Sequence, residues 1–157
     1  MTEFQAYEFT DVEDRTAESV LRRVREHYAG HVYWRRVYAN LKGPGPFNLA
    51  AVARAAEHQG QQRAEAVLTR LREAPGEDVV ETLADVPGLD VWRLLRDVDS
   101  EAVRWSVEAD ARLAQRHGTL PTVLFRGPGG DRVVSGVAPF EEYVAAIDAV
   151  APLLEAA

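Results

Sequence analysis

A proline stands at the head of a β-branched and aromatic run late in the chain, within residues 116–125. Proline has no N–H to give to a sheet, so it is tolerated at the start of a strand. We therefore expect a strand that begins at Pro121 rather than a helix that ends there. The glycine-rich connection 126–131 and the run 132–136 complete a β-hairpin. Pro139 suits the first turn of a following helix. Apolar residues then recur at helical spacing through the C-terminus: Phe140, Val144, Ile147, Ala151 and Leu154.

The N-terminal quarter of the chain predicts a strand, a helix and a second strand. The aromatic-rich run 4–9 and the alternating run 31–38 are typical of strands. Between them, residues 10–13 have the pattern of a helix capping box and Asp14 is a second candidate cap, so we expect the helix to begin within this window. Gly30 should end it. The link between strands is short, which indicates a βαβ unit with a right-handed parallel pair. One apolar stripe defines the helix: Ala17, Val20, Leu21, Val24 and Tyr28.

The middle of the chain predicts helices alone. A glycine- and proline-rich break at 42–46 precedes them, and residues 47–117 carry apolar stripes at helical spacing. Short helices are expected over 79–84 and 90–96, and Ser100 should cap a longer one that reaches about residue 116. Helices this short cannot form a hydrophobic core by themselves. We interpret 42–117 as a helical insertion in a single domain of residues 1–157. Its two main stripes are Leu49, Val52, Ala53 and Ala56, and Ala64, Val67, Leu68 and Leu71.

The absence of cysteine restricts the chemistry of the chain. It excludes disulfides, thiolate nucleophiles, iron–sulfur clusters and cysteine-based zinc sites. His27 and His31 are four apart but lie on either side of Gly30, so they would not share a face for a metal. His58 and His117 are expected near helix C-termini, where an imidazole suits the dipole. We expect no metal site, no cofactor and no catalytic residue.

The charge and the hydropathy of the sequence exclude further classes of function. A net charge of −7 argues against nucleic acid, whose binding requires basic residues that neutralise phosphates. No apolar run approaches the ~18 residues of a membrane span, and the first thirty residues do not resemble a signal peptide. We expect no membrane partner and a cytoplasmic location.

The three tryptophans fall in separate elements and are expected in the core or at an interface: Trp34, Trp92 and Trp105.

The predicted chain resembles the DsbA-like thioredoxins in the order of its elements: βαβ, a helical insertion, and ββα with a proline before the third strand. This family is related to the kappa-class glutathione transferases and the hydroxychromene carboxylate isomerases. The resemblance covers nearly the whole chain. Residues 120–122 match the cis-proline element of that family, 135–140 its closing strand-to-helix step, and 88–90 the Gly-Leu-Asp of its helical insertion. Asp11 stands where these proteins carry an Asp three residues before the active-site dithiol. The fold implied is α/β, with a mixed thioredoxin-like sheet and an all-helical insertion.

The chain departs from this family at the active site. Alignment on Asp11 places Asp14, Arg15, Thr16 and Ala17 over the family's Cys-x-x-Cys. A helix N-terminus that would stabilise a thiolate would here meet the Asp14 carboxylate, which we interpret as a structural cap. These four residues are vestigial active-site positions. Thiol–disulfide exchange by this chain is excluded because it has no sulfur nucleophile.

Two functions of different class remain open. In the family, the backbone beside the cis proline pairs with an extended peptide or a thiol ligand, which implies binding at Thr119, Leu120 and Pro121. The first hypothesis is a redox-inactive protein that binds a peptide or protein partner there. The alternative is an enzyme of the kappa transferase or isomerase kind, in which the hydroxyl of Thr16 or Thr10 activates a low-molecular-weight thiol. The chain also lacks most of the extra N-terminal strand of many relatives, so a partner or a second copy could cover an exposed sheet edge, giving a possible homodimer.

Overall fold

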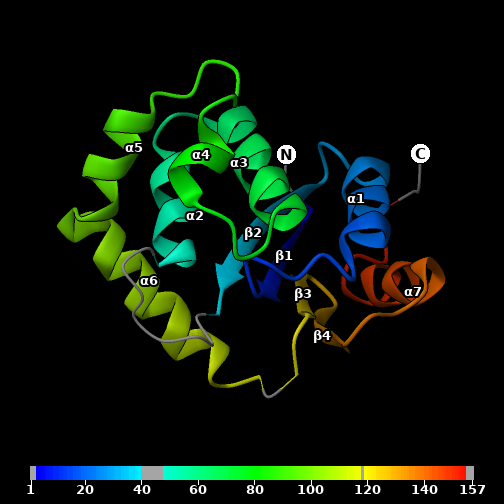
Figure 1. Ribbon diagram of the computed structural model, residues 1–157. Coiled ribbons are helices and arrows are strands. Elements are labelled where there is room, and N and C mark those ends of the chain that lie inside the picture. Colours follow the sequence, from blue (N-terminus) through cyan, green and yellow to red (C-terminus); the bar gives the residue numbers. More distant parts are fainter. Residues whose placement is uncertain (1–2, 40–47, 118, 155–157) are drawn as a thin grey trace. The chain divides into compact units, whose positions relative to one another are not determined.

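A four-stranded sheet and helices make up the structure, a computed structural model that describes residues 3–39, 48–117 and 119–154 (Figure 1). The strand order is β2-β1-β3-β4, and β3 runs antiparallel to both of its neighbours in a mixed sheet. The predicted order βαβ, helices, ββα is confirmed. The elements are β1 (Phe4–Thr10), α1 (Glu18–His27), β2 (Val32–Tyr38), α2 (Leu49–Glu57), α3 (Gln61–Glu73), α4 (Val79–Leu83), α5 (Val91–Val98), α6 (Glu101–Ala114), β3 (Thr122–Gly127), β4 (Gly130–Ser135) and α7 (Phe140–Val150).

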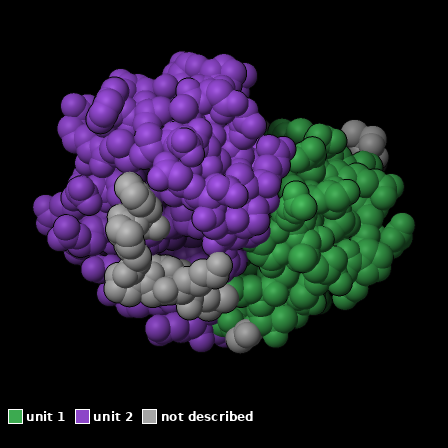
Figure 2. All heavy atoms as spheres, in the orientation of Figure 1, with its two compact units in different colours: residues 1–10, 14–37, 117–157 green, residues 11–13, 38–116 purple. Residues whose placement is uncertain are grey.

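The chain divides into two compact units, which Figure 2 colours separately. Unit 1 holds residues 1–10, 14–37 and 117–157, and unit 2 holds residues 11–13 and 38–116. The single domain over 1–157 with an insertion over 42–117 stays a prediction. The glycine- and proline-rich break that should open this insertion lies outside the described residues.

Unit 1 is built on one apolar face of the sheet. Side chains of a strand alternate between the two faces, so Phe4 and Ala6 of β1 point to one side, and Ala6 pairs with Phe125 of β3. The helices α1 and α7 contribute the other half of this core. The predicted stripe of α1 is confirmed, because Leu21, Val24 and Tyr28 are buried in it. The buried members are Phe4, Ala6, Ala17, Leu21, Val24, Tyr28, Val123, Phe125, Val134, Ala138, Tyr143, Ile147, Val150 and Ala151.

The predicted start of α1 is wrong. The helix begins at Glu18, and its N-cap residue Ala17 makes no side-chain capping bond. The expected capping box at 10–13 is a turn, in which Asp11 Oδ1 accepts a hydrogen bond from the Glu13 N–H at 2.9 Å. Short polar side chains bond backbone donors two residues ahead as readily as they cap helices. Here Asp11 closes a local turn instead of capping the helix, and α1 begins further along the chain, at Glu18.

The hairpin β3–β4 touches the end of α7. The Gly129 N–H donates to the Val150 carbonyl at 2.8 Å. A Cβ on Gly129 would lie 2.2 Å from the backbone oxygen of Ala149, so only glycine allows this approach. Because the Val150 carbonyl bonds to the hairpin, α7 ends there, and Leu154 N bonds to Ala151 instead. The helix predicted through the C-terminus therefore stops four residues before Leu154.

Unit 2 consists of helices that bury alanine, valine and leucine. The predicted stripes of α2 and α3 are confirmed as buried. Side chains cap most of its helices, although α3 begins after Gly60 without such a cap, and the Ser100 hydroxyl accepts from the Val103 N–H as expected. Asn48, Asp78 and Asp90 cap α2, α4 and α5 in the same way.

One ion pair is enclosed in unit 2. Asp110 of α6 is fully buried, and its Oδ2 accepts hydrogen bonds from Arg54 Nε at 2.9 Å, from Arg54 Nη2, and from the Tyr38 N–H at 3.2 Å. Burial acts to lower the pKa of Arg54, but Asp110, Glu57 and Tyr38 together outweigh it, so that pKa lies above its usual value. The pair links α2 to α6.

The three tryptophans, which the sequence places in the core or at an interface, have different surroundings. Trp34 is partly buried in the core of unit 1. Trp92 on α5 is 84% exposed and Trp105 on α6 is 67% exposed, so neither is a core residue. Apolar side chains this large and this exposed are unusual and mark candidate contact surfaces.

Candidate functional site

Residues 14–17, which the sequence aligns with the dithiol site, form a tight turn before α1. Asp14 Oδ1 accepts hydrogen bonds from the N–H of Thr16 at 2.9 Å and from its hydroxyl at 2.7 Å. Asp14 therefore caps this turn, and the expectation that it caps α1 is wrong, because the N-cap residue is Ala17. Arg15 is exposed and its carbonyl accepts from the Glu18 N–H at 3.1 Å. Ala17 is buried in the core of unit 1.

The segment before β3 presents free backbone groups. The Leu120–Pro121 peptide bond is cis. Pro121 is buried, and its carbonyl accepts from the Gly136 N–H at 2.7 Å, which extends the pairing of β3 with β4 by one residue. The Thr119 carbonyl accepts from the Thr122 hydroxyl. Within the described part of the chain, neither the N–H nor the carbonyl of Leu120 makes a hydrogen bond.

The two predicted segments both belong to unit 1. The structure brings Asp14 and Thr16 together, and separately Thr119 with Thr122. Among the residues described, no hydrogen bond or ion pair joins 14–16 to 119–121. The structure thus defines a polar turn and a proline bend, each held by its own local contacts.

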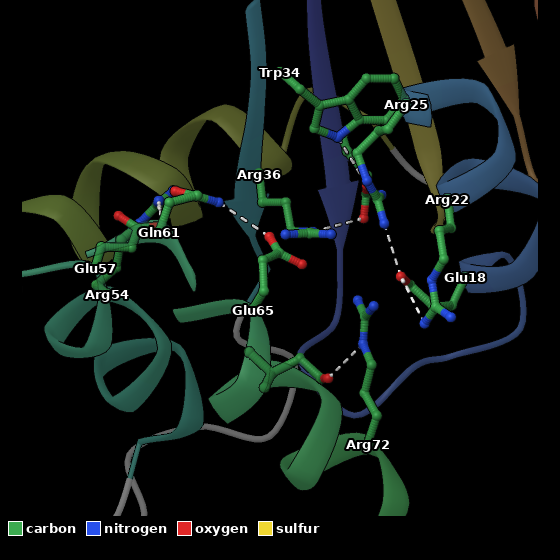
Figure 3. A network of polar contacts seen from close by, with 12 residues as sticks. Glu18, Arg22, Arg25, Trp34, Arg36, Arg54, Glu57, Gln61, Glu65 and Arg72 are labelled. Atoms are coloured by element: carbon green, nitrogen blue, oxygen red, sulfur yellow. Dashed lines mark hydrogen bonds and ion pairs between the residues drawn. The ribbon is translucent and has the colours of Figure 1, made fainter. Parts of the chain in front are cut away.

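The sequence did not predict a buried carboxylate on β1, that of Glu8. Figure 3 labels three of the residues around it, Arg25, Trp34 and Arg36. Glu8 is 1% exposed, and its Oε1 accepts from Trp34 Nε1 at 3.0 Å and from Arg25 Nη1 at 3.3 Å. Its Oε2 lies 3.5 Å from Arg36 Nε. Arg25 also binds Glu18 at 2.8 Å, which ties β1 to the first turn of α1. One signal could have revealed Glu8, because it follows Phe4 and Ala6 at the inward-facing positions of an alternating strand.

The chemistry available to this network is electrostatic. A buried carboxylate is costly unless cations and donors compensate it, and here the two guanidinium groups of Arg25 and Arg36 and an indole N–H do so. We interpret the cluster as the polar part of the core of unit 1. The described residues include no group of three or more His, Cys, Asp or Glu side chains that could hold a metal ion.

The histidines have separate surroundings. His31 Nδ1 lies 2.9 Å from Glu3, and His58, the C-cap residue of α2, lies 3.6 Å from Asp97. His117 packs on the Phe9 ring with centroids 4.2 Å apart.

None of the helices among the described residues combines the length and the apolar character that crossing a bilayer requires.

Comparisons with solved structures define the class of fold. DsbA2 of Pseudomonas aeruginosa superposes with a TM-score of 0.73 at 21% identity, covering 98% of this chain and 92% of that one. The α-DsbA2 thiol-disulfide exchange protein of Wolbachia pipientis gives 0.77 at 13% identity, over 94% of this chain and 81% of that one. A thioredoxin-like oxidoreductase from Silicibacter pomeroyi gives 0.72 at 24% identity, over 94% and 86%. No protein-family model and no curated protein sequence matches the chain.

The chain therefore has the thioredoxin-like fold of the DsbA proteins, as its sequence predicts. It carries this fold without a cysteine, so the dithiol site of thiol-disulfide exchange is absent from the sequence.

Proposed function

We propose that this protein is a redox-inactive DsbA-like protein that binds an extended segment of a peptide or protein partner beside Pro121. The fold and the lack of cysteine support the first half of the proposal. The observation that carries the second half is the backbone of Leu120, whose N–H and carbonyl make no hydrogen bond to any described residue.

Free backbone groups beside a strand favour strand addition. An extended peptide donates and accepts at alternate residues, so it can pair with Leu120 while side-chain pockets set its specificity. Thr119 is exposed and Leu120 is partly exposed, which leaves this stretch accessible in the chain by itself. The rigid bend at Pro121, fixed to Gly136, would hold the acceptor and donor in place and lower the entropic cost of binding.

The alternative, a thiol-dependent transferase or isomerase, finds less support. It needs a hydroxyl that donates to a bound thiolate, and the Thr16 hydroxyl is engaged by Asp14 at 2.7 Å. A carboxylate beside the site would also repel a thiolate. The second candidate hydroxyl, that of Thr10, belongs to a side chain that is 2% exposed. A thermal-shift titration with glutathione tests this alternative, because a ligand of the native state must raise the melting temperature.

The proposal is tested with a displayed library of unstructured peptides. The strongest binder is synthesised in its natural form and with N-methyl groups on alternate backbone amides. Strand addition predicts saturable binding that is lost when the methyl groups fall on one set of alternate amides and is retained when they fall on the other set. Equal binding of all three peptides, or no saturable binder in the library, would contradict the proposal.

The partner is expected to be a peptide or protein rather than nucleic acid or membrane, as the net charge of −7 favours. The cytoplasmic location also stays a prediction, which cell fractionation tests.

A further inference from the structure

The helix α6 carries a second apolar stripe that remains exposed within the described part of the chain. One face packs in the core of unit 2 through Val103 and Val107, and Ala114 is buried as well. On another face, three to four residues apart, stand Ala102, Trp105, Ala109 and Leu113. Trp105 is 67% exposed and Leu113 is 36% exposed. We call these four residues the outer stripe. A helix normally buries an apolar stripe, so this one is a candidate contact surface.

The outer stripe is complementary to a reversed copy of itself. Ala109 lies at its centre, with Trp105 four residues before and Leu113 four residues after. If two copies of α6 pair antiparallel about a two-fold axis at Ala109, Trp105 of each faces Leu113 of the other. The small central residue lets the helix axes approach closely, and the large residues on either side fill the space beside it.

The charges flanking the stripe favour the same orientation. Glu108 precedes Arg112 on one side of the helix. In an antiparallel pair, Glu108 of one copy lies about 1.5 Å from the two-fold axis and Arg112 of the other about 4.5 Å from it, measured along the helices, at the same end and on the same flank, so the two can form an ion pair. A parallel pair about a two-fold axis would place these flanks on opposite sides of the interface, where the charges do not meet. Within the residues described, Glu108 and Arg112 form no ion pair in their own chain.

We infer that the outer stripe of α6 is a homodimer interface, in which two copies of this chain pair through α6 in antiparallel orientation. The occupant of this surface is a second copy of the chain, selected by its self-complementary size and charge order. One helix pair is small beside the ~1,600 Å² of a standard interface, so we expect a dissociation constant of roughly 10 µM or weaker. The inference is independent of peptide binding beside Pro121.

Sedimentation equilibrium across a concentration series tests the interface, with four matched variants. Trp105→Ala should raise the dimer dissociation constant by about 30-fold or more, as expected of a central aromatic anchor. Trp92→Ala removes an even more exposed tryptophan from α5 and should leave the constant unchanged. Arg112→Glu should weaken the dimer, and Glu108→Arg with Arg112→Glu should restore it. A wild type that remains monomeric at about 1 mM, or equal effects of the two tryptophan variants, would overturn the inference.

Single-cysteine cross-linking gives the geometry, because the chain contains no cysteine of its own. Ala109→Cys places a thiol beside its copy at the proposed two-fold axis, whereas Leu153→Cys places one at a 95% exposed position of unit 1. Under mild oxidation the Ala109→Cys protein should form a covalent dimer at least about 10-fold faster. Equal rates for the two proteins would contradict the antiparallel pairing.

Discussion

Replacing Asp110 by Asn tests whether the buried ion pair holds unit 2 together. The carboxylate is fully buried and accepts hydrogen bonds from the Arg54 guanidinium and from the Tyr38 N–H. Asn keeps one acceptor oxygen and the shape of the side chain but removes the charge. Arg54, which is also buried, would then lose its buried partner and keep only the carboxylate of Glu57, which lies 2.8 Å away and is 37% exposed.

The magnitude follows from the burial of both partners. Removing one member of a buried ion pair typically costs about 3–5 kcal/mol, because the remaining charge keeps its desolvation penalty. Each hydrogen bond to a charged group contributes about 1.5–3 kcal/mol, and these contributions do not add. We therefore expect Asp110→Asn to lower the free energy of unfolding by about 3–4 kcal/mol.

Guanidinium denaturation followed by circular dichroism measures the loss. Asp131→Asn is the matched control, because Asp131 accepts two hydrogen bonds from Arg126 at 3.0 Å but on the surface, and its midpoint should not change. Arg54→Met combined with Asp110→Asn removes both charges and should recover a large part of the stability. A single Asp110→Asn variant within about 1 kcal/mol of the wild type would refute the reasoning.

Three further substitutions test the fold. Gly129→Ala places a methyl group against the Ala149 carbonyl and should cost about 1–3 kcal/mol in the same assay; a stability equal to the wild type would mean that the hairpin does not press on α7. Tyr28→Phe removes a buried hydroxyl that has no hydrogen-bond partner among the described residues and should be neutral or stabilise by about 1 kcal/mol. Burial raises the pKa of Tyr28, so the wild type should lose stability as the pH rises past the ordinary tyrosine pKa, where the unfolded chain ionises first; an equally steep alkaline loss in Tyr28→Phe would contradict this. Ser100→Ala deletes the cap of α6 and should cost about 1 kcal/mol, whereas no change would show that the Val103 N–H has another acceptor.

The sequence predicts the fold well where one pattern excludes the others. Few folds other than a thioredoxin-like sheet are compatible with the observed patterns. These are Pro121 before an apolar run, the glycine-rich turn after that run, and an apolar helical stripe near each end of the chain. The buried faces of α1, α2 and α3 follow directly from their apolar spacing. Element type is decided by periodicity over many residues, which is why these predictions succeed.

Prediction from the sequence fails where one side chain has several possible hydrogen-bond or packing partners. Asp11 and Asp14 can each cap a helix or close a local turn, and only the tertiary structure shows that both close turns. The end of α7 depends on Gly129 of the β3–β4 hairpin, which precedes Val150 by 21 residues. The exposure of Trp105 could not be predicted because both faces of α6 carry apolar residues.

A peptide titration followed by ¹⁵N-resolved NMR tests the central claim most directly, that a DsbA-like fold without cysteine retains a strand-addition site. We predict that a bound peptide shifts the amide of Leu120 and slows its exchange with solvent, while Trp92 on α5 stays unchanged. A peptide that binds without affecting the amide of Leu120 would contradict the account.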